Sequence, residues 1–237
     1  MKPPTFNDSN VLQPSNHSSC YATFLSSMDL LPAFEAFVYS LQLQGDTVTP
    51  LVVVVAYRDK AMETIGIRYA KSVLSKYPQL MWELYVLSES SHSSAVVKTL
   101  PARLLTLSLW RLEQCGKVLY MDPGSLILRD IAAVFQIPFD RFLGSLDRDK
   151  VSPIAIGYQY HGDVFLLKPS LHIYGSLIES INTINSDDFK DPLPKIFEAY
   201  FAHDGGACCL PLEYNIPKTL VRYWPQFWNF SDTRILT

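Results

Sequence analysis

The chain has 237 residues, of which 48% are hydrophobic and 18% are charged. This balance supports a sizeable core and excludes an intrinsically disordered protein. Lysine and arginine number 20 against 23 acidic residues, so the net charge of −3 shows none of the basic footprint of a nucleic-acid-binding protein. The longest apolar run, residues 50–56, is far too short to span a bilayer.

Residues 1–19 are rich in proline, asparagine and serine, and they lack the charged segment followed by an apolar run that is typical of a signal peptide. We expect them to form a flexible N-terminal tail. The remainder contains no internal repeat and no glycine- or serine-rich linker. A single domain over residues 20–237 is therefore the economical interpretation.

The four cysteines are Cys20, Cys115, Cys208 and Cys209. None belongs to a CxxC pair and no His/Cys grouping has zinc spacing, so we expect buried free thiols in a reducing compartment. Three glycosylation sequons, which begin at Asn7, Asn16 and Asn229, fit a secretory location instead. We favour a cytoplasmic location and keep the secretory pathway as the alternative.

The first predicted elements are a strand, a helix and a second strand. Residues 20–25 form a short apolar run typical of a buried strand. Residues 30–44 place apolar side chains on one helical stripe, with Pro32 suited to a first turn and Gly45 to the end of the helix. Residues 51–55 are an uninterrupted β-branched run, which indicates a parallel strand covered on both faces.

The alternation continues through the middle of the chain. Helices are predicted over residues 59–77 and 101–114, and strands over residues 81–87 and 117–121. Asp122 follows the last of these strands directly. Parallel α/β sheets bind ligands beyond the carboxyl ends of their strands, so this pattern puts Asp122 on the ligand side.

The second half is less regular, with a strand predicted over residues 163–167 and helices over residues 170–181 and 194–202. The whole pattern predicts an α/β fold with a mostly parallel sheet and helices on both faces.

The strand 117–121 ends in Asp122-Pro123-Gly124, followed by Ser-Leu-Ile-Leu-Arg-Asp-Ile. This stretch resembles the metal-binding segment of glycosyltransferase family 8, the glycogenin and galactinol synthase group of GT-A enzymes. Residues 160–170 are similar to that family's Phe-Asn-Ser-Gly-Val-x-x-Leu-x-Pro-Ser. Residues 204–206 and 210–215 are similar to the start of its Asp-Gly-Gly-Asp-Gln loop and to its Leu-Pro-x-x-Tyr-Asn. The resemblance covers most of the chain from Cys20 onward.

The resemblance implies a GT-A fold and a retaining enzyme that transfers a hexose from a nucleoside diphosphate sugar, UDP-linked, to a hydroxyl group of a glycan or small-molecule acceptor. It also implies that Mn²⁺ or Mg²⁺ bridges two aspartates and the diphosphate, because a bound cation neutralises the departing diphosphate.

The same resemblance suggests a role for each candidate residue. It implies that Asp122 contacts the metal or the diphosphate, and that Thr23 and Phe24 of the first strand hold the nucleotide. Thr106 stands where the family has a phosphate-facing lysine, and Arg103, about one helical turn earlier, is the candidate replacement. The residues implied to face the sugar are Asp163, Asp204, Gly205 and Gly206, with the two aspartates as the catalytic candidates.

Several positions depart from the family pattern. Gly124 stands where the second metal-binding aspartate is expected, and a glycine has no side chain with which to bind a metal. His161 is the candidate ligand that replaces it, in partnership with Asp122. The competing interpretation makes His161 an ordinary loop residue and Asp122 a cap of the turn before Pro-Gly.

Two other interpretations of the whole chain follow from these departures. In one, the protein is a catalytically inactive member of the family that binds a glycan, a nucleotide or another protein. In the other, it is a truncated form of a longer enzyme.

Overall fold

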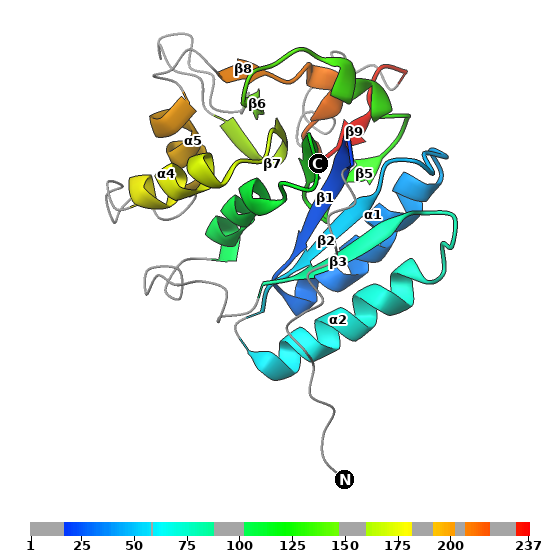
Figure 1. Ribbon diagram of the computed structural model, residues 1–237. Coiled ribbons are helices and arrows are strands. Elements are labelled where there is room, and N and C mark those ends of the chain that lie inside the picture. Colours follow the sequence, from blue (N-terminus) through cyan, green and yellow to red (C-terminus); the bar gives the residue numbers. More distant parts are fainter. Residues whose placement is uncertain are drawn as a thin grey trace.

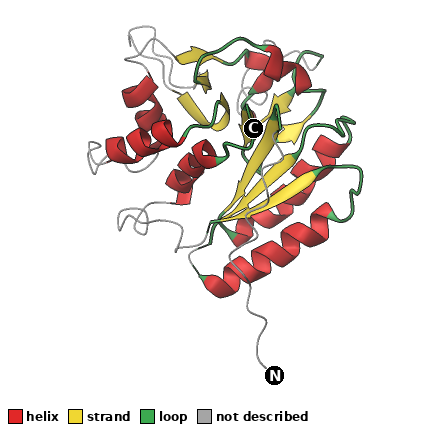
Figure 2. Cartoon of the chain, viewed as in Figure 1, coloured by secondary structure: helices red, strands yellow, loops and turns green. Residues whose placement is uncertain are grey.

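The computed structural model describes residues 17–57, 59–87, 102–146, 160–181, 192–201, 207–218 and 231–237. Within these ranges the chain forms a seven-stranded sheet with helices on both faces, and a separate two-stranded sheet (Figure 1). Helices and strands alternate through the first half of the chain (Figure 2). The predicted α/β class, with helices on both faces, is confirmed.

The central sheet has the strand order β3-β2-β1-β4-β7-β6-β8. Its strands are β1 (Cys20–Leu25), β2 (Leu51–Val55), β3 (Trp82–Val86), β4 (Val118–Met121), β6 (Phe142–Leu146), β7 (Tyr160–Leu167) and β8 (Ala207–Cys209). Strands β1 to β4 are parallel, and β7 is antiparallel to β4. The chain leaves β1 toward β2 and β3 and returns to β4 on the other side of β1. The carboxyl ends of β1 and β4 therefore flank the topological switch point, where sheets of this kind bind their ligands.

One face of the sheet is covered by α1 (Leu31–Gln42) and α2 (Lys60–Leu74). Helix α1 buries the stripe predicted from the sequence, has Pro32 in its first turn, and is followed by Gly45 at φ +75°. Asp59 caps α2 by accepting hydrogen bonds from the backbone N–H groups of Ala61 and Met62 at 2.7 and 3.0 Å.

The other face is covered by η3 (Ala102–Arg111), α4 (Leu171–Ile181) and α5 (Pro192–Phe201). Trp110 is fully buried there against Phe142, Phe165 and the phenylalanines of α5. The helix predicted over residues 101–114 is a 3₁₀ helix that ends at Arg111. Its three-residue hydrogen-bond spacing continues just beyond that end, where the N–H of Leu112 donates to the carbonyl of Leu109.

Several short elements lie outside the sequence prediction. Strands β5 (Leu126–Ile127) and β9 (Ile235–Leu236) pair antiparallel to form the small sheet. Strand β6 lies between β7 and β8 in the large one. Short 3₁₀ turns are η1 (Met28–Leu30), η4 (Ala132–Gln136) and η6 (Leu212–Tyr214). None of the helices within the described ranges combines the length and apolar character needed to cross a membrane.

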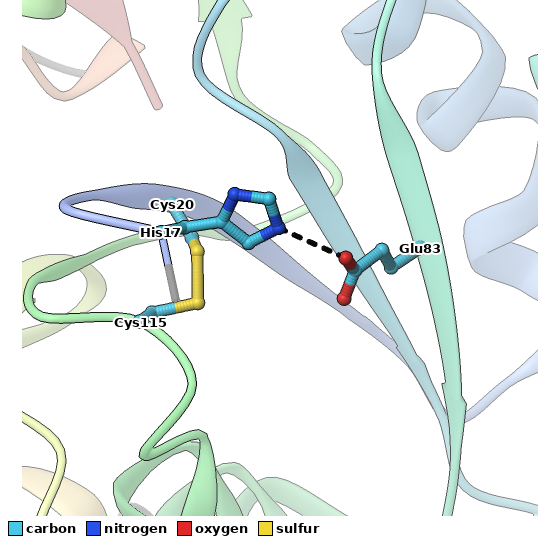
Figure 3. The surroundings of a disulfide bond; sticks show 4 residues. All are labelled: His17, Cys20, Glu83 and Cys115. Carbon is cyan, nitrogen blue, oxygen red and sulfur yellow. Dashed lines mark hydrogen bonds and ion pairs between the residues drawn. A yellow bond between two sulfur atoms is a disulfide. The ribbon is translucent and has the colours of Figure 1, made fainter. Parts of the chain in front are cut away.

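The prediction of free thiols is wrong for two of the four cysteines. Cys20, at the start of β1, and Cys115, just before β4, form a disulfide with a Cα–Cα distance of 5.8 Å (Figure 3). The two cysteines are 95 residues apart, so no short motif contains both of them. The parallel pairing of β1 with β4 brings them together in the fold. Cys209 is not part of a disulfide, and the side chain of Cys208 lies outside the described residues.

Further contacts hold the same end of the sheet. His17 accepts a hydrogen bond from the backbone N–H of Gly116, and its Nε2 lies 3.0 Å from Oε1 of Glu83 on β3 (Figure 3). The buried Tyr21 hydroxyl donates to Asp46 at 2.7 Å. Burial and the neighbouring Asp46 carboxylate raise the pKa of Tyr21, so the phenol stays a hydrogen-bond donor.

Candidate functional site

The candidate site lies at the carboxyl ends of β1 and β4. Strand β1 pairs with β2 over Tyr21–Leu25, but it pairs with β4 only over Cys20–Ala22. The last three residues of β1, Thr23–Leu25, therefore extend past the end of the β4 ladder. We call this segment the β1 overhang. It ends beside the switch point, the place where sheets of this kind bind their ligands.

Two predicted nucleotide-binding residues lie in the β1 overhang. The side chains of Thr23 and Phe24 are only 0% and 3% exposed. Phe24 packs in the core on the η3 face, and the alternation of the strand puts Thr23 on the opposite face, with Leu25. Both residues are thus part of the core, and their contact with a nucleotide stays a prediction. Within the described part of the chain, the buried Thr23 hydroxyl has no hydrogen-bond partner.

Asp122 begins a tight turn directly after β4. Its Oδ2 accepts a hydrogen bond from the backbone N–H of Gly124 at 2.9 Å, and its carbonyl oxygen accepts one from the N–H of Ser125 at 2.9 Å. A Cβ placed on Gly124 would lie 3.1 Å from that Oδ2, so a side chain at position 124 would crowd the carboxylate. Of the two roles considered for Asp122, this geometry is that of the turn cap, and contact with a ligand stays a prediction.

Asp163 is next to Asp122 across the β4–β7 ladder. The backbone N–H of Asp122 donates to the carbonyl oxygen of Asp163 at 2.8 Å, and the next pair of the register is Met121 with Val164. Both aspartates are half-buried. The structure thus joins the backbones of two aspartates that lie 41 positions apart in the sequence and that were predicted to belong to one site.

A second segment, residues 212–218 with residues 231–237, packs beside this turn. Ile216 forms a bridge with Leu236, and Lys218 donates its backbone N–H to the carbonyl of Thr237 at 2.7 Å. The exposed Lys218 ammonium donates to the carbonyl oxygen of Gly124 at 3.0 Å. Sequence analysis missed this contact, because it depends on the pairing of distant segments.

Helix α1 and the residues just after it hold β5, the short strand that follows the turn. The Ser40 hydroxyl accepts the N–H of Ile127 at 3.0 Å, and the Gln44 amide donates to the Ile127 carbonyl at 3.1 Å. Ser125 is 1% exposed, and its hydroxyl has no hydrogen-bond partner among the residues that the structure describes. A buried unpartnered hydroxyl is rare in a well-packed protein, which makes Ser125 a residue that only the structure draws attention to.

The described residues do not fit the divalent cation that the family resemblance implies. Asp122 uses one carboxylate oxygen to cap its own turn, and Gly124 has no side chain that could supply a second carboxylate. Among the parts of the chain that the structure describes, no three His, Cys, Asp or Glu side chains come together as a metal site. A hard cation such as Mn²⁺ or Mg²⁺ needs several oxygen ligands, and this turn supplies too few of them.

The remaining predicted site residues cannot be compared with the structure in the same way. Asp204, Gly205 and Gly206 lie outside the described residues, as do the side chains of His161 and Arg103. Thr106, which stands at the position of the family's phosphate-facing lysine, is described and is 4% exposed within η3. The backbone of His161 belongs to β7, two residues before Asp163.

Comparison with known proteins gives matches at the level of structure. No protein-family model and no curated protein sequence matches the chain. The apo structure of the bifunctional glycosyltransferase WbbM is similar, with a TM-score of 0.62 and 12% identity over 99% of this chain and 46% of WbbM. The galactosyltransferase LgtC, in complex with donor and acceptor sugar analogs, has a TM-score of 0.56 and 13% identity over 91% of this chain and 86% of LgtC.

A third similar structure is the apo form of the glycosyltransferase GlyE from Streptococcus pneumoniae, with a TM-score of 0.58 and 14% identity. The match covers 92% of this chain and 54% of GlyE, so the chain spans about half the length of WbbM and of GlyE. Identities this low establish the fold alone. Together with the strand order and the helices on both faces, they show that the chain has the GT-A glycosyltransferase fold.

Proposed function

We propose that the chain binds a nucleoside diphosphate sugar, UDP-linked, between the carboxyl ends of β1 and β4, and transfers its hexose to a hydroxyl group of a glycan or small-molecule acceptor with retention. The observation that carries this proposal is the β1 overhang beside the Asp122 turn, at the switch point of a GT-A fold. The LgtC structure, which holds donor and acceptor sugar analogs, supports the same substrate class. The motif similarities support membership of glycosyltransferase family 8.

The residues have separate roles in this proposal. The carboxyl end of β1 holds the nucleotide, and the Asp122 turn lies beside the diphosphate. Asp163, fixed next to Asp122 by the backbone hydrogen bond, faces the sugar. Asp204, Gly205, Gly206 and Arg103 are proposed from the motif similarity alone. No step of the transfer is assigned to a metal, because the described residues do not build a site for one.

The test is a calorimetric titration of UDP into the full chain, first with Mn²⁺ and then with EDTA, followed by a screen of UDP-sugars for hydrolysis or transfer. We expect UDP to bind and one donor sugar to be turned over. Asp163→Ala should lose turnover while it keeps UDP binding, since this carboxylate is proposed to act at the sugar rather than at the nucleotide.

Asp140→Ala is the matched control. Asp140 is an exposed carboxylate just before β6, which runs parallel to β4, so it lies at the opposite end of the sheet. This variant should behave like the wild type. Binding of UDP without turnover of any donor would favour the inactive binding protein, and a lack of UDP binding under both conditions would refute the proposal.

A further inference from the structure

The motif similarity predicts two carboxylates and a metal ion at the Asp122 turn. The structure has one aspartate there, together with the ammonium group of Lys218. Gly124 has lost the side chain that would hold a metal, and its carbonyl oxygen instead accepts a hydrogen bond from the Lys218 ammonium at 3.0 Å. An ammonium group and a divalent cation both carry positive charge. The ammonium donates hydrogen bonds to the oxygens of a diphosphate, and the cation binds the same oxygens as ligands.

The position of Lys218 is fixed by backbone pairing rather than by a flexible loop. Its N–H bonds to Thr237, Ile216 bonds to Ile235, and Thr237 bonds back to Ile216. These residues extend the small sheet, of which β5 follows the Asp122 turn directly. The lysine side chain itself is exposed, and Gly124 takes only one of the three N–H donors that an ammonium carries.

We propose that Lys218 supplies the positive charge that faces the diphosphate at the end of β4, in place of a divalent cation. This inference rests on the proposed function, because it names the group that binds the diphosphate of that same donor. Asp122 then shapes the turn and directs the Gly124 carbonyl toward the lysine. The ligand class is a nucleoside diphosphate, bound without a requirement for metal.

The experiment compares UDP affinity in EDTA for the wild type and four variants. Lys218→Ala and Lys218→Met should weaken binding roughly tenfold to hundredfold, as expected for the loss of a charge-assisted hydrogen bond. Lys218→Arg should retain most of the affinity. Lys71→Ala removes an exposed lysine from the last turn of α2, which lies toward the other end of the sheet, and should have no effect. Equal thermal unfolding temperatures would confirm that the Lys218 variants are folded.

The outcomes separate the two proposals. Metal-independent UDP binding that depends on Lys218 and not on Lys71 would support the inference. If UDP binds only with Mn²⁺ and Lys218→Ala binds as well as the wild type, the inference is wrong while the proposed function stands. If the wild type fails to bind UDP in either condition, the proposed function itself fails.

A different observation carries a second inference. The Cys20 and Cys115 side chains are 0% and 1% exposed, and they join β1 to the loop before β4 across 95 residues. Structural disulfides form and persist in oxidising compartments, and they are rare in the cytosol. We infer that the chain folds in an oxidising compartment. The two thiols would lose two protons and two electrons to a disulfide of a thiol–disulfide oxidoreductase, which is reduced to its dithiol.

Thiol counting on protein isolated from its own cells tests this inference. The protein is denatured without reductant, labelled with a maleimide of known mass, and compared with a reduced sample. We expect four labels after reduction, since the chain has four cysteines, and at least two fewer before it, because Cys20 and Cys115 are joined. Peptide mapping should find Cys20 joined to Cys115. Four labels without reductant would overturn the inference.

Discussion

The two ends of the central sheet are built differently. At the amino end, polar groups are paired: Tyr21 bonds to Asp46, His17 contacts Glu83, and a disulfide joins β1 to the segment before β4. At the carboxyl end, the β1 overhang extends past its β4 partner, and the hydroxyl of Ser125 is buried without a hydrogen-bond partner.

This difference separates stability from binding. Paired polar groups and a covalent link rigidify the end opposite the proposed ligand site. The Asp122 turn carries an exposed lysine, which contributes little to folding, so in the proposed function this lysine serves binding. The contrast predicts that substitutions at the amino end cost stability, whereas polar substitutions at the carboxyl end affect ligand binding instead.

The largest expected effect on stability comes from the disulfide. Replacing both Cys20 and Cys115 with alanine should lower the free energy of unfolding by about 4 kcal/mol, because a cross-link that closes so long a loop strongly restricts the unfolded chain. Chemical denaturation measures the loss. Cys209→Ala, which removes a cysteine outside the disulfide, is the control and should cost much less. A wild-type unfolding curve that does not move on addition of reductant would contradict the prediction.

The next effect comes from the hydroxyl of Tyr21. Tyr21→Phe removes the 2.7 Å hydrogen bond to Asp46 and should cost about 1–2 kcal/mol, since the acceptor is a charged group that is only partly shielded from water. Tyr39→Phe is the matched control, because the Tyr39 side chain is 51% exposed and its hydroxyl should contribute little. Equal losses in the two variants would show that the Tyr21–Asp46 contact does not stabilise the fold.

Thr23 should behave in the opposite way. Its hydroxyl is buried without a partner, so Thr23→Val exchanges an unsatisfied polar group for a methyl group and should leave stability unchanged or raise it by up to about 1 kcal/mol. Ser145→Ala is the contrasting control. The buried Ser145 hydroxyl donates to the Val164 carbonyl at 2.8 Å, and its removal should cost about 1 kcal/mol. A clear loss of stability in Thr23→Val would mean that its hydroxyl has a role in the folded chain.

Much of the first half of the fold was predictable because its signals are local. The valine run of β2 and the apolar stripe of α1 lie within single elements, and both were located within a few residues of their observed bounds. The strand β6 was missed, since its five residues include Gly144 and show no strong alternation. Strands β5 and β9 are two residues each, and Ile127 finds Ile235 only through the folded chain.

The candidate site divides in the same way. Asp122 was singled out because it follows an apolar strand, and Asp163 because of the motif similarity, and the structure joins their backbones by a hydrogen bond. The disulfide and the contact of Lys218 with Gly124 join residues about a hundred positions apart, so no local sequence pattern predicts them. Pairing between distant segments decides these features, and a single sequence carries little information about it.

The smallest expected effect is a pH dependence that arises at the amino end. Burial alone would raise the pKa of Asp46, but hydrogen bonds from the backbone N–H of Thr49 and the hydroxyl of Tyr21 outweigh it, so the pKa is lowered in the folded protein. A lowered folded pKa stabilises the protein above the unfolded value of about 3.9, and this contribution is lost as the pH falls through the folded pKa. Unfolding temperatures measured from pH 6 down to pH 3 should therefore fall less steeply for Asp46→Asn than for the wild type. Identical slopes would mean that other carboxylates govern the acid sensitivity, and that the amino end of the sheet is held by its disulfide rather than by its polar contacts.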